Sequence, residues 1–322
     1  MEDSSTHNSQ NSSPYSDIER RTKEIYIAQH KNYAKDKTIF DRFLAVASDP
    51  NSYDLPRDFF RDKTVLDAGC GNTGYFQVAM NSLNVASQTC LDLGNDWIVE
   101  LELVLQMYGM PKDKFTFVEG STTRLPFPDE SFDFVASNGV IMHLETQEDA
   151  AIALRELSRV TKKGGYLYVY SGVDQPGIVD RYIAPALRKA YAEDQDFRRF
   201  IDNIDHQKIT QELKKSFIDA RKFDKSLSKS FVKSIEKLFT LDSATFTQNM
   251  LQVPIQQGPT LGFEWAKKEL ENIGMSKIRR VKEHYWIRND YRKYLAPLHY
   301  FRELEVARLL YGGGHVKIVA EK

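Results

Sequence analysis

The sequence has little cysteine, almost no net charge and no long apolar run. Its 322 residues include two cysteines, Cys70 and Cys90, and no C-x-x-C pair, which argues against a disulfide framework or a structural zinc site. Two isolated thiols are typical of a reducing compartment. No apolar run approaches the ~18–20 residues that cross a bilayer, and the polar N-terminus lacks the apolar segment of a secretory signal. We expect a cytoplasmic protein with no metal site and no membrane partner.

The charges nearly cancel, with 44 basic and 45 acidic residues giving a net charge of -1. A sequence-independent nucleic-acid binder usually carries a strong basic excess, so this balance argues mildly against nucleic acid as a partner. Hydrophobic residues make up 41% and aromatic residues 12%, which is typical of a folded core. The length suits one large α/β domain with an insertion, or two modest domains. Nothing in the sequence indicates an oligomeric state.

Composition and periodicity divide the chain into five segments. Residues 1–17 are polar and predict a disordered tail, and residues 18–60 have the apolar spacing of an N-terminal helical lid. Residues 61–173 alternate short strands with helices and predict a Rossmann-like core. Residues 174–260 are charged, aromatic and helical in pattern, and predict an inserted helical cap. Residues 261–322 return to a helix and two strands that complete the sheet of the core.

The β-α alternation predicts an α/β fold with a seven-stranded, mostly parallel sheet and helices on both faces. The expected strands are residues 64–69, 86–93, 114–120, 132–140, 162–171, 276–289 and 312–322. The expected helices of the core are residues 75–83, 95–110, 146–161 and 262–274, with Thr146 as a plausible N-cap.

A glycine-rich stretch, "VLDAGCGNTGYF", links the first strand to the first helix of this core. Gly69, Gly71 and Gly74 have the G-x-G-x-x-G spacing of a tight turn that lets a ligand approach the backbone. Asp92 ends the second strand, 18 residues after Gly74 (92 − 74), where its carboxylate can accept both ribose hydroxyls. NAD sites and S-adenosylmethionine (SAM) sites share these features. Asp67 would repel a pyrophosphate near the turn, whereas the sulfonium and ammonium groups of SAM tolerate it.

Two downstream segments, "LPFPDESFDFV" and "ELSRVTKKGGYLYV", complete a family pattern. With the glycine-rich stretch they make residues 63–173 resemble the class I SAM-dependent methyltransferase superfamily, and within it the small-molecule group with the LPFPDxSFD motif. The combination is specific for the superfamily but not for a substrate. The resemblance implies SAM as the cofactor and a methyl acceptor as the second ligand.

The resemblance also implies a role for each matching residue. Asp67, Gly69, Gly71 and Gly74 would surround the methionine part of SAM, with Cys70 contributing its backbone. Asp92 would hold the ribose and Leu93 would lie against the adenine, while Asn138 and Gly139 would line the sulfonium end.

Two positions depart from the family pattern or leave alternatives open. The family usually has an Asp after the third strand to take the adenine amino group, and this chain has Ser121, which accepts a hydrogen bond without charge assistance. The backbone of Thr122 then becomes more important. In related enzymes an aromatic hydroxyl from the N-terminal helix closes over the methionine end, and Tyr33 or Tyr26 is placed to do so here. The alternative is that such a tyrosine anchors its helix on the core.

His143 follows the fourth strand and is the candidate catalytic residue, because a neutral imidazole can take a proton near pH 7. Structural packing at the start of a helix is the alternative. The aromatic residues of segment 174–260 and beyond are open to two readings, a cage for a cationic acceptor or a helix-packing core, and the second is favoured.

The leading hypothesis is a methyltransferase acting on a nitrogen, oxygen or sulfur atom of a small molecule enclosed under the cap. RNA or protein methylation is the first alternative, although the chain lacks the "DPPY" or "NPPY" motif of many base N-methylases. A non-catalytic SAM-binding regulatory protein is the second.

Overall fold

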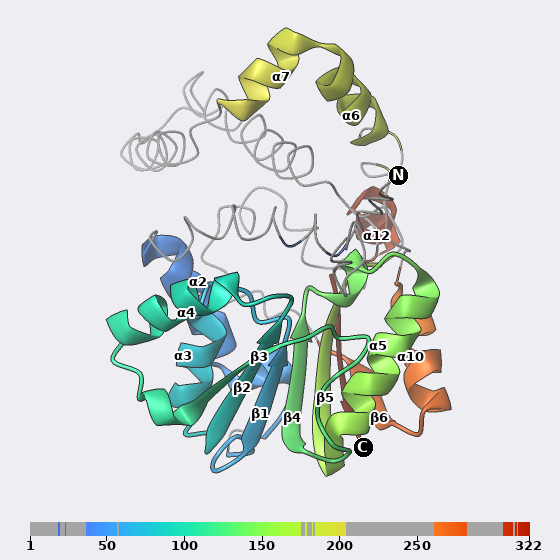
Figure 1. The fold of residues 1–322 in the computed structure, drawn as a ribbon. Helices are drawn as coiled ribbons and strands as arrows, with labels where there is room; N and C mark the ends of the chain where they lie inside the picture. The colour runs from blue at the N-terminus through green and yellow to red at the C-terminus, as the bar shows by residue number, and fades with distance from the viewer. Residues whose placement is uncertain are drawn as a thin grey trace, which may run out of the picture.

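A seven-stranded sheet forms the centre of the molecule (Figure 1). The computed structural model describes residues 37–56, 58–174, 184–203, 261–281, 305–311 and 315–322, together with Glu19, Lys23, Ile178, Tyr182 and Gly313. The strands lie in the order β3-β2-β1-β4-β5-β7-β6, and β7 runs antiparallel to both of its neighbours while the other pairs are parallel. Their bounds are β1 (Thr64–Ala68), β2 (Ser87–Asp92), β3 (Phe115–Glu119), β4 (Phe132–Asn138), β5 (Thr161–Val173), β6 (Ser276–Arg280) and β7 (His315–Glu321). This arrangement confirms the predicted fold class.

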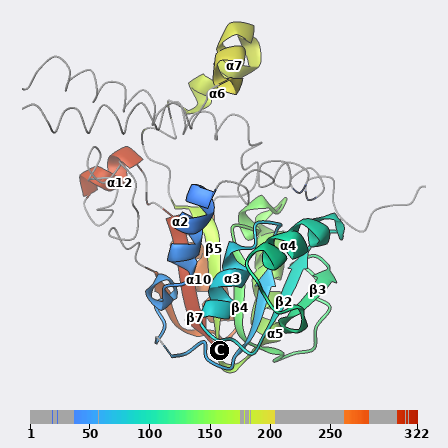
Figure 2. The same ribbon diagram turned by 90° about the vertical axis from the view of Figure 1, so that its left-hand side faces the viewer.

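Helices cover both faces of the sheet, as Figures 1 and 2 show. The first face carries α2 (Lys37–Ala47), α3 (Tyr75–Ser82) and α4 (Asp96–Met107), and the second carries α5 (Gln147–Val160) and α10 (Phe263–Asn272). The described part of the chain also contains α6 (Ala184–Glu193), α7 (Gln195–Asp202), α12 (Glu305–Tyr311) and the short 3-10 turns η1 (Pro50–Tyr53), η2 (Lys112–Lys114) and η3 (Ile141–His143).

Successive residues of each central strand point to opposite faces, so the strands are apolar on both sides. Val65 belongs to the same buried cluster as Phe76 of α3, whereas Leu66, the next residue, belongs to the cluster that contains Leu154 of α5. This double burial explains why the strands form continuous apolar runs in the sequence. It also fixes the direction of the polar residue Asp67, which shares the face of Val65.

Helix α5 begins where the sequence predicts. The Thr146 Oγ1 atom accepts a hydrogen bond from the Asp149 backbone N–H at 3.0 Å, and the Asp149 carboxylate accepts one from the Thr146 N–H at 3.1 Å. The two bonds satisfy donors that would otherwise be unpaired at the start of the helix, as in a capping box. They confirm Thr146 as the N-cap.

The predicted lid and cap are described only in part. Helix α2 lies within the lid segment, and α6 and α7 lie within the cap segment, beyond the end of the sheet at which β5 finishes (Figure 1). The tail of residues 1–17, Tyr26, Tyr33 and residues 204–260 fall outside the described residues. Among the helices that are described, none combines the length and the apolar run that would carry it across a bilayer.

Candidate cofactor site

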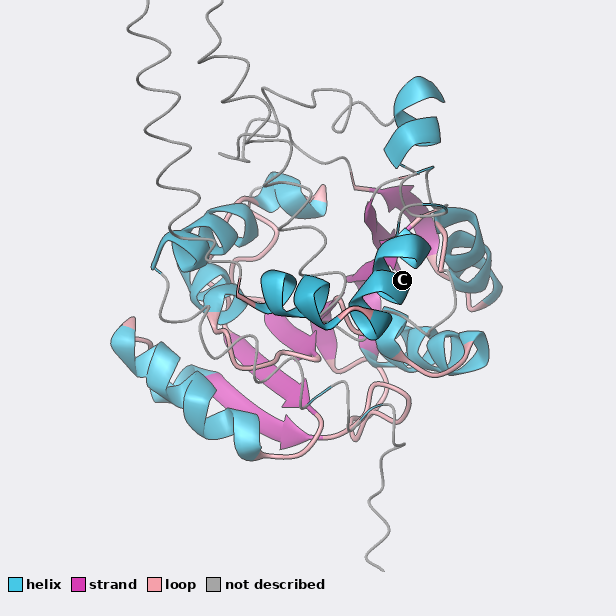
Figure 3. Cartoon of the chain, turned by 90° about the horizontal axis from the view of Figure 1, so that it is seen from above, coloured by secondary structure: helices cyan, strands magenta, loops and turns pink. Residues whose placement is uncertain are grey.

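The site lies at the carboxyl ends of β1, β2 and β4, the end that faces the viewer in Figure 3. β1 lies between β2 and β4, so the chain leaves it toward β2 and later returns to its other side at β4. In parallel α/β sheets such a reversal of strand order leaves a crevice outside the strand ends, where ligands bind. Asp67, Asp92 and Asn138 stand at or near these three ends.

The glycine-rich loop folds back over the end of β2. The N–H groups of Gly69 and Cys70 donate to the Leu91 carbonyl at 2.7 and 3.1 Å. The N–H of Gly71 donates to Asp92 Oδ2 at 2.7 Å. Gly69 has a φ of 91°, and a Cβ at that position would collide with the side chain of Val140. Glycine is therefore required here by both backbone conformation and space.

Asp92 is tied into this loop by both of its carboxylate oxygens. Oδ1 accepts the Leu93 backbone N–H at 2.7 Å, and Oδ2 accepts the N–H of Gly71. Burial raises the pKa of Asp92, while the two backbone donors and the charge of Lys23 oppose that rise. A carboxylate with about four lone-pair sites keeps acceptor capacity for a ligand after these two bonds.

Asp67 is 5% exposed and faces a neutral partner. The Nε2 atom of Gln77 donates to Asp67 Oδ2 at 2.7 Å, a bond that stabilises the carboxylate without neutralising it. Burial raises the pKa of Asp67 to about 7, and the nearby charge of Asp92 adds to this rise. A cation next to this pair of acids would relieve both effects. The two carboxylates therefore fit the ammonium and sulfonium groups of SAM, and they do not fit a pyrophosphate.

Asn72, inside the glycine-rich loop, adds an acceptor that the motif does not reveal. Its side chain is 2% exposed and its Nδ2 donates to Glu100. Its Oδ1 atom is buried and has no hydrogen-bond partner among the described residues. An unsatisfied buried acceptor is costly, so this oxygen suits a donor that a ligand brings.

At the end of β4, Asn138 contacts Tyr75 of α3. The Nδ2 atom of Asn138 donates to the Tyr75 hydroxyl at 3.0 Å. The Tyr75 ring stacks on Phe43 of α2, with 5.1 Å between the ring centroids. Burial raises the pKa of Tyr75 to about 12, so the hydroxyl keeps its proton. Gly139 has a φ of 82°, which turns the backbone away from the strand.

Ser121 and Thr122 follow β3, on the far side of Asp92 from the loop. The Thr123 N–H donates to Ser121 Oγ at 3.3 Å, and the Ser121 hydroxyl donates to Glu19 Oε1 at 2.9 Å. Thr122 is buried. Ser121 and Thr122 thus extend to β3 the row of residues at the carboxyl ends of β4, β1 and β2, which we call the strand-end edge.

His143 ends η3, shortly after β4. Burial lowers its pKa to about 4, so the ring is uncharged at neutral pH. Cys70 and Cys90 are both buried free thiols, and burial together with Cys90 raises the pKa of Cys70 well above its usual value. Cys70 is therefore a protonated thiol and not a nucleophile.

The structure brings most of the predicted residues to one edge. Those on this edge are Asp67, Gly69, Cys70, Gly71, Gly74, Asp92, Leu93, Ser121, Thr122, Asn138, Gly139 and His143. Tyr33 lies outside the described residues. Sequence reasoning missed Asn72, Tyr75, Gln77, Glu19 and Lys23. Asn72 and Tyr75 sit inside the glycine-rich stretch, so their position was a usable signal, whereas nothing local marks the other three.

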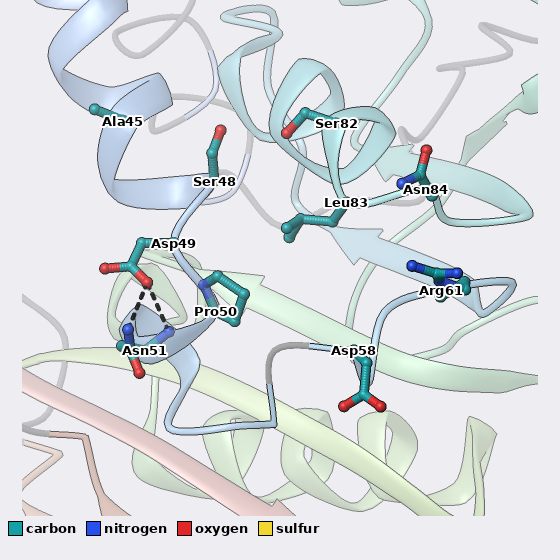
Figure 4. A pocket seen from close by; sticks show the side chains of 10 residues that line it. All are labelled: Ala45, Ser48, Asp49, Pro50, Asn51, Asp58, Arg61, Ser82, Leu83 and Asn84. Carbon is teal, nitrogen blue, oxygen red and sulfur yellow. Dashed lines mark hydrogen bonds between the residues drawn. The ribbon is translucent and has the colours of Figure 1, made fainter.

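A cavity of about 970 Å³ lies away from this edge (Figure 4). It is lined by residues of the α2–η1 turn, the stretch before β1 and the end of α3, among them Asp49, Arg61 and Asn84. These residues border the amino ends of β1 and β2, opposite to the carboxyl ends that carry Asp67 and Asp92. We do not assign the cofactor to this cavity.

Comparison with known families identifies the core. Residues 66–169 match the model of a methyltransferase domain. The chain is 34% identical over 131 residues to the fatty-acid O-methyltransferase of Mycolicibacterium smegmatis, covering 41% of this chain and 43% of that protein. It is 33% identical over 118 residues to the mouse protein named "Probable tRNA methyltransferase 9B", covering 35% of this chain and 24% of that protein. The chain spans less than half the length of these curated relatives.

Among solved structures, the methyltransferase bound to the Trm112 activator of Haloferax volcanii aligns with 93% of this chain and 96% of its own. The identity is 13% and the TM-score 0.48, so this likeness supports no inference about ligands. The family match and the sequence relatives confirm the superfamily predicted from the motifs. Residues 66–169 match a methyltransferase domain, the class for which the sequence motifs imply SAM as the cofactor.

Proposed function

We propose that this chain, built on a SAM-dependent methyltransferase domain, methylates a nitrogen, oxygen or sulfur atom of a small molecule. The observation that carries the proposal is the pair of buried carboxylates, Asp67 and Asp92, at the ends of adjacent strands beside the glycine-rich loop. One carboxylate suits the positive end of SAM and the other suits its ribose.

The cofactor supplies a methyl group already activated by a sulfonium. The residues of the chain therefore have to orient the cofactor and the acceptor, and they do not have to activate the methyl group. Asp67 and the Asn72 oxygen hold the positive end, and Asp92 fixes the ribose. The Asn138–Tyr75 pair shapes the wall after β4. Alignment of this kind can lower the barrier by roughly 7–11 kcal/mol. A general base is needed only when the acceptor atom carries a proton.

Support for a small acceptor comes from the region beyond the strand ends. Helices α6 and α7 lie on that side of the sheet (Figure 1), and Phe200 of α7 and the preceding Tyr182 have exposed side chains. The relatives include a fatty-acid O-methyltransferase, which adds support for an acceptor with apolar parts. We also infer that residues 18–60, 61–173, 174–260 and 261–322 act as lid, core, cap and completion of the core in a cytoplasmic enzyme.

RNA is a second candidate acceptor. It is favoured by the relative named "Probable tRNA methyltransferase 9B", which matches this chain over a third of its length. The net charge of -1 counts against it, since phosphate contacts need a basic surface.

We further propose that His143 faces the acceptor. Because burial holds its pKa near 4, the ring is neutral at physiological pH, and a neutral imidazole has one nitrogen that can accept a proton. A general base is most effective when its pKa lies near the working pH, so a pKa near 4 makes His143 a weak base and places its contribution at the low end of the usual range.

The test uses the full chain with methyl-labelled SAM, offered in parallel to a metabolite extract, to total tRNA and to a protein extract. We expect label in the small-molecule fraction and less label in a reaction with Asp92→Ala at the same SAM concentration. Label that enters only tRNA or only protein would overturn the small-molecule proposal. Binding of SAM without transfer to any fraction would favour a non-catalytic regulatory protein.

A further inference from the structure

Two residues from far upstream lie against the ends of β2 and β3. Glu19 Oε1 accepts a hydrogen bond from the Ser121 hydroxyl at 2.9 Å, directly after β3. Lys23 forms an ion pair with Asp96, the first residue of α4, and its side chain is 20% exposed. A Cβ on Gly94 would collide with the Lys23 ammonium, so that side chain crosses the turn between β2 and α4.

Lys23 also lies close enough to Asp92 for its charge to oppose the raised pKa of that carboxylate. Glu19 and Lys23 are both helical and partly buried, and they are four residues apart, a spacing that places two side chains on the same face of a helix. The pair therefore contacts the strand-end edge at two points, one after β2 and one after β3.

The position of these contacts is the nucleoside end of the site. Asp92, at the end of β2, is the acceptor for the ribose, and the loop after β1 takes the methionine part. Neighbouring strands are about 4.8 Å apart, so a base attached to that ribose and directed away from the loop reaches the end of β3. Ser121, Thr122 and Glu19 are the polar groups found there.

The 6-amino group of adenine is a hydrogen-bond donor and needs an acceptor. The Ser121 hydroxyl donates its proton to Glu19, so the negative charge at this end of the edge belongs to Glu19. A carboxylate offers about four lone-pair sites, more than the bond from Ser121 occupies. A bond from the amino group to this ionised acceptor is stronger than one to a hydroxyl.

We propose that Glu19 accepts the hydrogen bond of the adenine 6-amino group and makes the site select a 6-aminopurine over a 6-oxopurine. Ser121 and Lys23 are positioning residues, which fix Glu19 through a hydrogen bond and through the ion pair with Asp96. The inference rests on the cofactor assignment. A 6-oxopurine presents a carbonyl oxygen to the carboxylate, which leaves two acceptors facing each other without a proton between them.

The test measures calorimetric binding of S-adenosylhomocysteine and S-inosylhomocysteine to the full chain. The wild type should bind the adenosyl compound at least about tenfold more tightly, because a charge-assisted bond is lost with the inosyl compound. In Glu19→Gln the ratio should fall to about 1, since an amide can donate to the oxo group as well as accept from the amino group.

The matched control is Glu264→Gln, which removes an exposed carboxylate from α10, on the other face of the sheet. It should keep the wild-type ratio. Ser121→Ala leaves Glu19 in place without its hydrogen bond, so we expect about a threefold loss for the adenosyl compound with a ratio still above 1. Thermal melting of each variant checks that it is folded.

The outcomes separate this inference from the cofactor assignment. Binding of the adenosyl compound to the wild type, with the same adenosyl-to-inosyl ratio in Glu19→Gln, overturns the role of Glu19 and leaves the cofactor untouched. Failure of the wild type to bind the adenosyl compound refutes both. If Glu19→Gln does not fold, the adenosyl-to-inosyl ratio is measured in Glu19→Asp instead. The shorter side chain moves the carboxylate away from the base, so we expect that ratio to fall as well, and an unchanged ratio would overturn the role of Glu19.

Discussion

The Nε2 atom of Gln77, in α3, donates a 2.7 Å hydrogen bond to Oδ2 of Asp67, in β1, and both side chains are buried. The bond holds the carboxylate in a fixed direction without supplying a positive charge. Asp67 therefore titrates near pH 7, far above an ordinary aspartate, and a bound cation would change its protonation state.

The first prediction concerns the pH dependence of SAM binding. A cation favours the ionised form of Asp67, so affinity should rise with pH until the pKa of about 7 is passed and then level off. The limiting slope below that pKa is about tenfold per pH unit, with one proton released on binding. Calorimetry in buffers of different ionisation enthalpy measures the proton count. Asp67→Asn should show neither the slope nor the release, and a slope that survives in this variant contradicts the assignment.

The second prediction concerns the free energy of unfolding. The folded state holds the Asp67 proton more tightly than the unfolded state, so this residue makes the protein less stable as pH rises from about 4 to about 7. Between pH 5 and 8 the loss is about 3 kcal/mol, on the order of two pKa units. Denaturant titrations at both pH values should therefore show Asp67→Asn gaining stability over the wild type at pH 8. An equal difference at both pH values would mean that Asp67 is ionised throughout.

The third prediction concerns Asp92. Asp92→Ala leaves the backbone N–H groups of Gly71 and Leu93 without their acceptor and removes the proposed partner of the ribose. SAM binding should weaken by roughly 1–3 kcal/mol. Asp92→Asn keeps one acceptor oxygen and should lose less. Calorimetric dissociation constants for both variants give the comparison, and unchanged affinity in Asp92→Ala would exclude a ribose contact.

The fourth prediction distinguishes the cost of a steric clash at Gly69 from the cost of its positive φ. Gly69→Ala meets the side chain of Val140 and also needs a φ of 91°, so we expect a loss of about 2–4 kcal/mol in unfolding free energy. Gly274→Ala is the matched control, because Gly274 has a φ of 84° and no heavy atom within 4 Å of the added Cβ. It should cost about 1–2 kcal/mol from strain alone. Equal losses of unfolding free energy at the two sites would show that the Val140 side chain can move aside without a measurable energetic cost.

The fifth prediction concerns His143. If the ring accepts the proton of the acceptor atom, His143→Ala should lower kcat about 100-fold while leaving the KM for SAM unchanged. The wild-type rate should show no titration near pH 6.5, because the pKa of His143 is about 4. A variant with normal kcat and a lowered melting temperature would assign His143 to packing.

Local patterns of apolar and polar residues in the sequence were sufficient to predict the core of this fold. The alternation of apolar strands and amphipathic helices predicted all seven strands, because residues on both faces of a buried parallel sheet must be apolar. Thr146 was predicted as the N-cap from its place at the start of the helical segment, and in the structure Asp149 completes the capping box. The glycine spacing and the acids at the ends of β1 and β2 were also readable, since strand ends of a parallel sheet meet at one edge.

The sequence by itself determined the α/β core, the glycine-rich loop and the acidic strand ends, because each depends on neighbours within a few residues. Only the tertiary structure decided that Gln77 faces Asp67, that burial brings the pKa of Asp67 to about 7, and that β7 enters between β5 and β6. It also decided that Glu19 meets Ser121, 102 positions away. Contacts of this kind arise from the packing of distant segments, and no local spacing or periodicity encodes which segments meet.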